Sequence, residues 1–140
     1  TLRSVKAMKL ASGAGTFQAD EKITQATSGA VGKVVEYDST NRIIYYQQER
    51  FADYGTPSDG NKDAFSGTYT ITGATSSATG APDAAADSSV DTGDSTVTFT
   101  NGFANEEIEH DSGDILYTES RRPISRASDQ TEDIKLIIEF

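Results

Sequence analysis

Residues 31–48 decide the fold class and read Val-Gly-Lys-Val-Val-Glu-Tyr-Asp-Ser-Thr-Asn-Arg-Ile-Ile-Tyr-Tyr-Gln-Gln. Successive side chains of an extended chain point to opposite faces, so Val31, Lys33, Val35 and Tyr37 share one face. The run at 38–41 consists of residues whose side chains hydrogen-bond to their own turn. We therefore predict a β-hairpin with strands at 31–37 and 42–48.

The rest of the chain continues this pattern. Residues 1–10 alternate weakly, which predicts an entering strand, and the small residues at 11–15 are expected to end it. Residues 65–73, 96–100, 115–119 and 134–140 have strand character, and Asn101-Gly102 predicts a tight turn. Residues 54–63 read as a polar loop. We predict an all-β fold: a small β-sandwich or barrel-like core with hairpins and long polar loops.

Residues 74–94 are almost wholly Ala, Ser, Thr, Gly, Asp and Pro. This composition is too poor in large apolar side chains to pack a core by itself. Two alternatives follow: a mobile loop, or a segment held against its neighbours.

An internal repeat relates two parts of the chain at a constant offset of 48 residues. The repeated residues are Phe17, Ile23, Thr24, Ala26, Thr27, Ser28, Ala30 and Gly32, which recur as Phe65, Ile71, Thr72, Ala74, Thr75, Ser76, Ala78 and Gly80. One such unit cannot bury its apolar face alone, so the repeat predicts two similar strand-turn units, the pseudo-symmetric halves of a small barrel or sandwich. Convergence of both segments on a shared turn is the alternative.

Length and charge limit the function classes. A chain of 140 residues suits one domain, with room for a small inserted module. Its net charge of −10 argues against nucleic-acid binding, which needs clustered Lys and Arg. The acidic surface either serves solubility or steers the protein towards basic partners. Because the chain starts at Thr1 and not at Met, we expect a fragment or a processed product.

The absence of cysteine excludes disulfides and thiolate metal sites, and it agrees with assembly in a reducing cytoplasm. No apolar run approaches the roughly 20 residues of a membrane span, so we expect a soluble protein.

No catalytic, cofactor or metal site is predicted. His110 is the only histidine, and its acidic neighbours favour a charged surface group over a metal ligand. Asp59, Asp63, Asp91 and Asp94 do not follow the calcium-loop pattern, which leaves only weak calcium binding open. The sequence has no nucleophile elbow and no phosphate-binding loop. A hydrolase would need two carboxylates that converge in a deep pocket.

Two groups of residues are candidates for protein contacts. Pro123 fixes its own φ and forms a rigid elbow, flanked by Arg121, Arg122 and Arg126. These arginines either dock another subunit or pair with acids just downstream, and both alternatives stay open. The downstream acids are Asp129, Glu132 and Asp133.

The second group is aromatic and comprises Tyr45, Tyr46, Phe51 and Tyr54. Because Tyr45 and Tyr46 alternate along a strand, both cannot enter one core, and one is expected to be exposed. Such a side chain would serve subunit packing or, as a sharper hypothesis, glycan stacking.

The C-terminal segment carries a family resemblance. Its features are His110, Ser112-Gly113, Tyr117, Glu119, Arg121, Pro123-Ile124 and then Asp129-Gln130-Thr131-Glu132 before an apolar strand. In this order they resemble the C-terminus of the dimeric baseplate-wedge subunit of T-even-type contractile phage tails, and Asp-Gln-Thr-Glu is the most specific part.

The resemblance implies a structural virion protein of the tail baseplate, assembled in the host cytoplasm and acting through protein interfaces. It implies other wedge and tail-pin proteins, and a second copy of the chain, as partners. The residues expected to form an interface or a structural lock are Tyr117, Arg121, Arg122, Pro123, Arg126, Asp129, Gln130 and Glu132.

The resemblance also suggests three parts of the chain: an entering strand and linker at 1–15, an inserted β module at 16–100, similar to versions in marine T-even-like phages, and the family segment at 101–140, which closes the sheet. The alternative function is a tail-associated or secreted β-sandwich that binds glycans.

Overall fold

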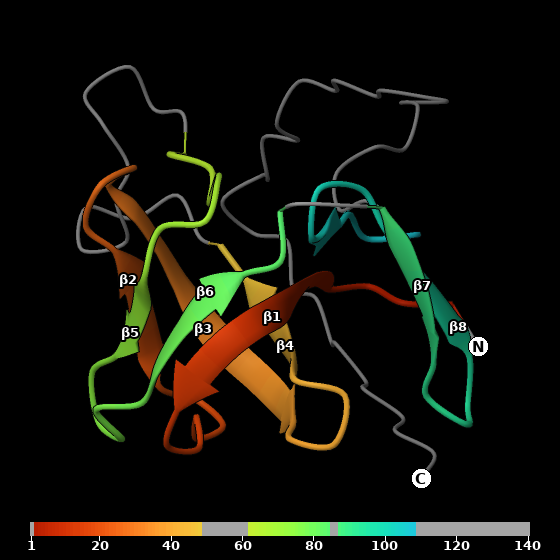
Figure 1. The fold of residues 1–140 in the computed structure, drawn as a ribbon, viewed down its shortest axis with the longest axis horizontal. Coiled ribbons are helices and arrows are strands. Elements are labelled where there is room, and N and C mark those ends of the chain that lie inside the picture. The colour runs from red at the N-terminus through yellow and green to blue at the C-terminus, as the bar shows by residue number, and fades with distance from the viewer. Residues whose placement is uncertain (1, 49–61, 85–86, 109–140) are drawn as a thin grey trace, which may run out of the picture.

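The structure is a computed structural model that describes residues 2–48, 62–84 and 87–108 (Figure 1). These residues contain nine β-strands and no helix, which confirms the predicted all-β fold. The strands are β1 (Lys6–Ala14), β2 (Lys22–Gln25), β3 (Ala30–Asp38), β4 (Ile43–Gln47), β5 (Ile71–Gly73), β6 (Thr79–Pro82), β7 (Ser88–Asp91), β8 (Thr96–Phe99) and β9 (Phe103–Ala104).

β1 closes the main sheet into an antiparallel barrel. The strand order is β4-β3-β2-β5-β6-β1-β9, and β1 also pairs with β4. On one edge of β1, Lys9 N–H donates to Gly102 O while Lys9 O accepts from Asp83 N–H; on the other edge, Leu10 N–H donates to Arg42 O. Because both edges of β1 are paired, β1 to β6 form a ring in which every strand has two neighbours (Figure 1).

The predicted end of the first strand at residues 11–15 is wrong. β1 continues to Ala14, with a register shift between Leu10 and Ser12. Small residues occur here because β1 and β6 approach closely: a Cβ on Gly13 would lie 2.5 Å from the Thr79 carbonyl oxygen. On β6, the Leu10 side chain packs against Gly80, where a Cβ would lie 2.6 Å from Leu10 Cδ1.

Residues 74–94 contain β6 and β7, so within the described part of this segment the second alternative holds: it is held against its neighbours. Ala78, Gly80 and Pro82 are buried. This segment has too few large apolar side chains to form a core by itself, but it completes the core that the other strands form.

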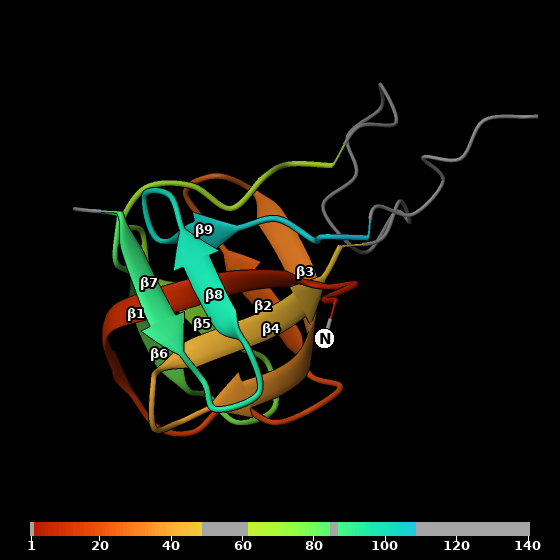
Figure 2. The same ribbon diagram turned by 90° about the vertical axis from the view of Figure 1, so that its right-hand side faces the viewer.

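Two apolar clusters lie on opposite sides of β1 and β4. The barrel interior holds Met8, Leu10, Phe17, Ile23, Ala30, Val34, Ile44, Tyr46, Phe65, Ile71 and Ala78. The second cluster holds Ala7, Ile43, Val97, Phe99 and Ala104, with Tyr45 and Val90 packed against it. It lies where the β7–β8 hairpin covers the outer face of β1 and β4 (Figure 2). Both faces of these two strands are therefore buried, so neighbouring residues such as Ala7 and Met8 enter different clusters.

The two copies of the repeat meet at the β2–β5 pair. Thr24 lies opposite Thr72, which is its own equivalent at the offset of 48 residues. Ile23 lies opposite Gly32 in the β2–β3 pair, and the equivalent residues of β5 and β6 pair in the same register. A local two-fold axis therefore passes between β2 and β5.

Buried polar side chains connect the copies across this axis. Glu21 is 4% exposed, and its carboxylate accepts hydrogen bonds from Gln18 N (2.6 Å), Thr75 N (3.1 Å), Ser76 N (2.9 Å) and the Ser76 hydroxyl (2.8 Å). It thus joins the segment before β2 to the turn after β5.

Gln25 forms the matching bridge. Its Oε1 accepts from Ser66 N (2.9 Å) and the Ser28 hydroxyl (2.6 Å), and its Nε2 donates to Tyr69 O (2.9 Å). Ser66 and Ser28 are the repeat equivalents of Gln18 and Ser76, so Glu21 and Gln25 join equivalent pairs of backbone regions on the two sides of the axis.

Burial raises the pKa of Glu21, but hydrogen bonds from Ser76, Gln18 and Thr75 outweigh it and hold the pKa below its ordinary value of 4.5. A carboxyl group whose pKa is lowered by folding stabilises the fold above the unfolded pKa and loses that contribution as the pH falls through the folded pKa. Glu21 therefore stabilises the barrel fully above about pH 4.5 and progressively less below it.

We predict that Gly13→Ala lowers the free energy of unfolding by about 1–3 kcal/mol, because the new methyl group must push β1 from the β6 backbone. Urea denaturation measures the change. Ser12→Ala, an exposed position on the same strand, is the matched control and should change stability little. Equal stability of the two variants would contradict the close approach.

We predict that Glu21→Gln lowers the free energy of unfolding by about 1–3 kcal/mol at neutral pH, because an amide cannot accept all of these hydrogen bonds. The gap between wild type and variant should shrink as the pH falls below about 4.5, since protonation removes the same bonds in the wild type. Denaturation curves from pH 3 to 7 test this, with Asp20→Asn as the exposed neighbouring control. A gap independent of pH would refute the role of the Glu21 charge.

Candidate functional site

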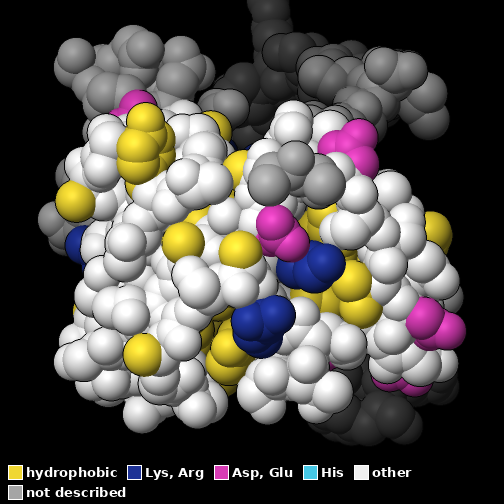
Figure 3. All heavy atoms as spheres, viewed as in Figure 1, with side chains coloured by type: hydrophobic (Ala, Val, Ile, Leu, Met, Phe, Trp, Pro, Cys, Tyr) yellow, Lys and Arg dark blue, Asp and Glu magenta, His cyan; other side chains and the backbone are white. Residues whose placement is uncertain are grey.

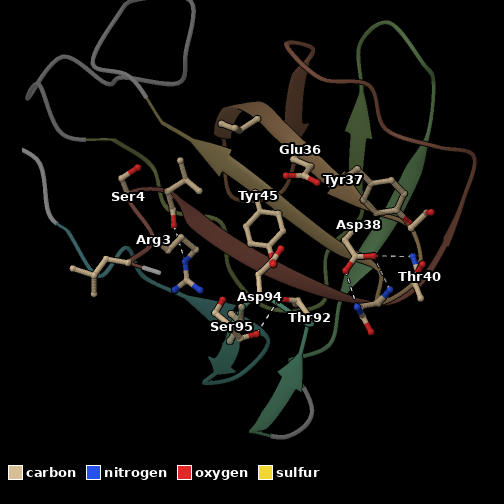
Figure 4. A pocket seen from close by; sticks show the side chains of 16 residues that line it. Arg3, Ser4, Glu36, Tyr37, Asp38, Thr40, Tyr45, Thr92, Asp94 and Ser95 are labelled. Atoms are coloured by element: carbon tan, nitrogen blue, oxygen red, sulfur yellow. Dashed lines mark hydrogen bonds between the residues drawn. The ribbon is translucent and has the colours of Figure 1, made fainter.

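A hollow of about 780 Å³ opens where three separate parts of the chain meet. Its walls are residues 2–5, the end of β3 with the β3–β4 turn, and the β7–β8 turn. Its lining includes Leu2, Arg3, Val35, Glu36, Asp38, Tyr45, Thr92 and Asp94. Figure 4 shows Tyr45 in the middle of this hollow, with Arg3 and Ser4 to one side and Tyr37 and Asp38 to the other.

The Asp38 carboxylate shapes the β3–β4 turn. It accepts hydrogen bonds from Thr40 N (2.9 Å), Asn41 N (3.0 Å) and Asn41 Nδ2 (2.7 Å), and Arg42 completes the turn at φ 56°. Burial raises the pKa of Asp38, but the bonds from Asn41 and Thr40 outweigh it and lower the pKa below its ordinary value. The turn therefore presents a fixed negative charge to the hollow.

The β7–β8 turn carries a second acid. Thr92 N and Thr92 Oγ1 both donate to Ser95 O, at 3.0 and 2.9 Å, and Gly93 N donates to Asp91 Oδ1 at 2.9 Å. Gly93 has φ 91°, a conformation that glycine adopts without strain. This tight turn holds Asp94 at the rim of the hollow.

Burial and nearby charges shift the pKa of the Tyr45 hydroxyl. Burial raises its pKa, and the negative charge of Asp38 raises it further; Arg3 acts in the opposite direction. Tyr45 also packs against the second cluster, so its ring is fixed from behind.

The Arg3 guanidinium donates to backbone carbonyl oxygens and forms no ion pair with Glu36, Asp38 or Asp94. Its Nε donates to Val5 O at 2.9 Å and its Nη2 donates to Asn105 O. The Glu36 and Asp94 side chains are exposed and form no hydrogen bond or ion pair with another described residue.

Apolar side chains also reach the surface at the hollow. Leu2 is 70% exposed and Val35 43% exposed, which places two of the large exposed hydrophobic side chains in its lining. The hollow therefore combines carboxylates, one aromatic ring and apolar edges.

On the face shown in Figure 3, the acidic side chains of the described residues are dispersed, and one of them lies beside basic side chains. Among residues 2–48, 62–84 and 87–108, no group of three or more His, Cys, Asp or Glu side chains is placed to hold a metal ion. The same part of the chain has no helix long and apolar enough to cross a membrane.

The predicted site residues divide into three groups. Tyr46 is 4% exposed and packs edge to face on Phe65, with ring centroids 5.1 Å apart, so Tyr46 is not the exposed aromatic and its prediction as a candidate for protein contacts is wrong. Tyr45 is half-buried and lines the hollow. The others lie outside the described residues: Phe51, Tyr54, Tyr117, Arg121, Arg122, Pro123, Arg126, Asp129, Gln130 and Glu132, as do His110 and Asp59.

No local sequence pattern indicated that Arg3, Glu36 and Asp94 lie close together in the fold. The alternation of Tyr45 and Tyr46 and the turn-forming Asp38 were the available signals, and both are local. The pairing of β1 with β4 and the packing of the β7–β8 hairpin bring the three walls together.

Comparison with known families gives one match. The family model described as Bacteriophage T4, Gp8 matches residues 67–140. The match extends well before residue 110, where the resemblance in the sequence begins, and it includes β5 to β9. Searches of curated proteins and of solved structures find no match. With slightly more than half of its 140 residues inside the family match, the chain belongs to the family of Bacteriophage T4 Gp8, a baseplate wedge subunit, and is a structural protein of a phage baseplate.

Proposed function

We propose that this protein is a rigid building block of the wedge in a contractile phage tail baseplate, and that it acts through protein–protein interfaces without a chemical step. The observation that carries the proposal is the family match, which runs from residue 67 through β5 to β9 to residue 140. A closed barrel supports it, because each strand of the ring is hydrogen-bonded on both edges and cannot shift without breaking bonds to two neighbours.

The proposed partners are neighbouring wedge and tail-pin proteins and a second copy of the chain. The proposed interface is the C-terminal segment that contains Tyr117, Pro123 and the arginines on either side of that proline. Arginine and tyrosine are enriched where protein interfaces are most strongly bound. The protein would assemble in the host cytoplasm and remain in the virion, and it would not contact nucleic acid.

The β module at residues 16–100 is part of this proposal, and its portion from residue 67 onwards lies within the family match. Its strands complete their ring with β1, so the module and the entering strand would move as one body. We propose that this body is a spacer that positions the C-terminal segment.

Cryo-electron microscopy of purified virions tests the function directly. We expect density for the barrel at equivalent positions in the six sectors of the baseplate. Density only at fibre tips would overturn the wedge proposal and support the glycan-binding alternative; absence from the particle would overturn both.

We predict that Tyr117→Ala and Pro123→Gly each reduce incorporation of the protein into baseplates by about tenfold or more, the effect of losing an interface anchor. Complementation of a phage lacking the gene, followed by quantitative mass spectrometry of particles, measures incorporation. Tyr69→Ala is the control, because Tyr69 is an aromatic residue on the barrel with 48% of its surface exposed. Normal incorporation of both C-terminal variants would argue strongly against the interface.

A further inference from the structure

We propose that the hollow between residues 2–5, the β3–β4 turn and the β7–β8 turn is a docking site for an arginine-bearing segment of a neighbouring protein chain. The inference rests on the proposed baseplate function and deepens it by naming a surface and the chemistry of its partner.

The carboxylates of the hollow favour a partner with a positive charge. Glu36 and Asp94 come from β3 and the β7–β8 turn, and neither carboxylate forms an ion pair with another described residue. Asp38 adds a third negative charge. Arg3, the cationic side chain in the lining, is turned towards the backbone oxygens of Val5 and Asn105. A partner's positive group would therefore meet carboxylates that the protein itself leaves unneutralised.

The ring favours arginine over lysine. A planar guanidinium can stack on the face of Tyr45 while its N–H groups donate to carboxylates on either side. A lysine ammonium offers a point charge and lacks this fork. Because Tyr45 is held from behind by the second cluster, it presents a preformed surface.

The apolar edges suit the rest of such a segment. Leu2 and Val35 are exposed where they line the hollow, and the methylene stem of an arginine or an adjacent apolar side chain would cover them. A volume of about 780 Å³ accommodates a few side chains and lies within the range of protein binding pockets.

The chain's own arginines at positions 121, 122 and 126 are the alternative occupants. The experiment below separates them from a neighbouring protein, because a covalent crosslink identifies the sequence that fills the hollow.

The test places the photo-crosslinking residue p-benzoylphenylalanine at Val35 of the full-length protein in assembled phage particles. After irradiation, mass spectrometry identifies the crosslinked peptide. We expect a peptide of a different baseplate protein that contains arginine. The Glu36→Gln/Asp94→Asn double variant should reduce this crosslink about tenfold, as the loss of two charged contacts predicts.

Two controls accompany the test. Asp20→Asn/Asp87→Asn removes the same charge at exposed positions outside the hollow and should leave the crosslink unchanged. The crosslinker at Tyr69, exposed but outside the lining, should not capture the same peptide.

A second measurement uses the isolated 140-residue chain and a defined probe. The peptide acetyl-Ala-Arg-Ala-amide should shift the NMR signals of Val35 and Tyr45, and its citrulline counterpart, which has the shape but not the charge, should bind about fivefold or more weakly. Equal binding of both peptides would overturn the proposal.

The remaining outcomes are also decisive. A crosslink to residues 109–140 of this chain, a crosslink to a peptide without arginine, or no crosslink in particles that contain the protein would overturn the docking site and leave the wedge function standing. Absence of the protein from the particles would overturn both.

Discussion

The close approach of β1 to β6 is the constraint on which the structure depends. Gly13 faces the Thr79 carbonyl at a separation that leaves no room for a Cβ, and the Leu10 side chain packs against Gly80. This contact joins the last strand of the ring to the first, while the other edge of β1 pairs with β4. Closure removes free strand edges from the ring and encloses Met8, Ile44 and their neighbours as one core.

Closure also explains why the chain uses its polar residues as it does. The two repeat copies meet at Thr24 and Thr72, and only two polar side chains, Glu21 and Gln25, are among the buried residues of the described part of the chain. Both side chains join the segment before the first strand of one repeat copy to the turn of the other copy. Burying a carboxylate and an amide is tolerated because each is satisfied by several donors or acceptors. The bridges thereby fix the two halves relative to each other.

The β7–β8 hairpin, which packs on the outside of the barrel, adds a carboxylate to the surface near Tyr45. The β7–β8 hairpin covers Ala7 and Ile43 on the outside of the barrel and carries Asp94 to the neighbourhood of Tyr45. Apolar packing on one side of the hairpin and a carboxylate at its tip follow from the alternation of a four-residue strand and the geometry of one tight turn. This surface is the one at which we propose that another subunit docks.

The sequence by itself determined the features that depend on residues close together in the chain. The hairpin at 31–48 appears as β3 and β4, and Asn101-Gly102 forms a two-residue turn with φ 52° and 82° between Thr100 and Phe103. The C-terminal motif identified the family. Each of these depends on side chains and backbone within a few residues of each other.

Only the tertiary structure decided which face of Tyr45-Tyr46 is the barrel core, because β7 and β8 bury the second face as well. Likewise, the small residues at 11–15 suggested a turn, and their reason, the backbone of β6, is distant in sequence. Arg3, Glu36 and Asp94 share a hollow because strand pairing and hairpin packing bring three distant segments together, which no local pattern encodes.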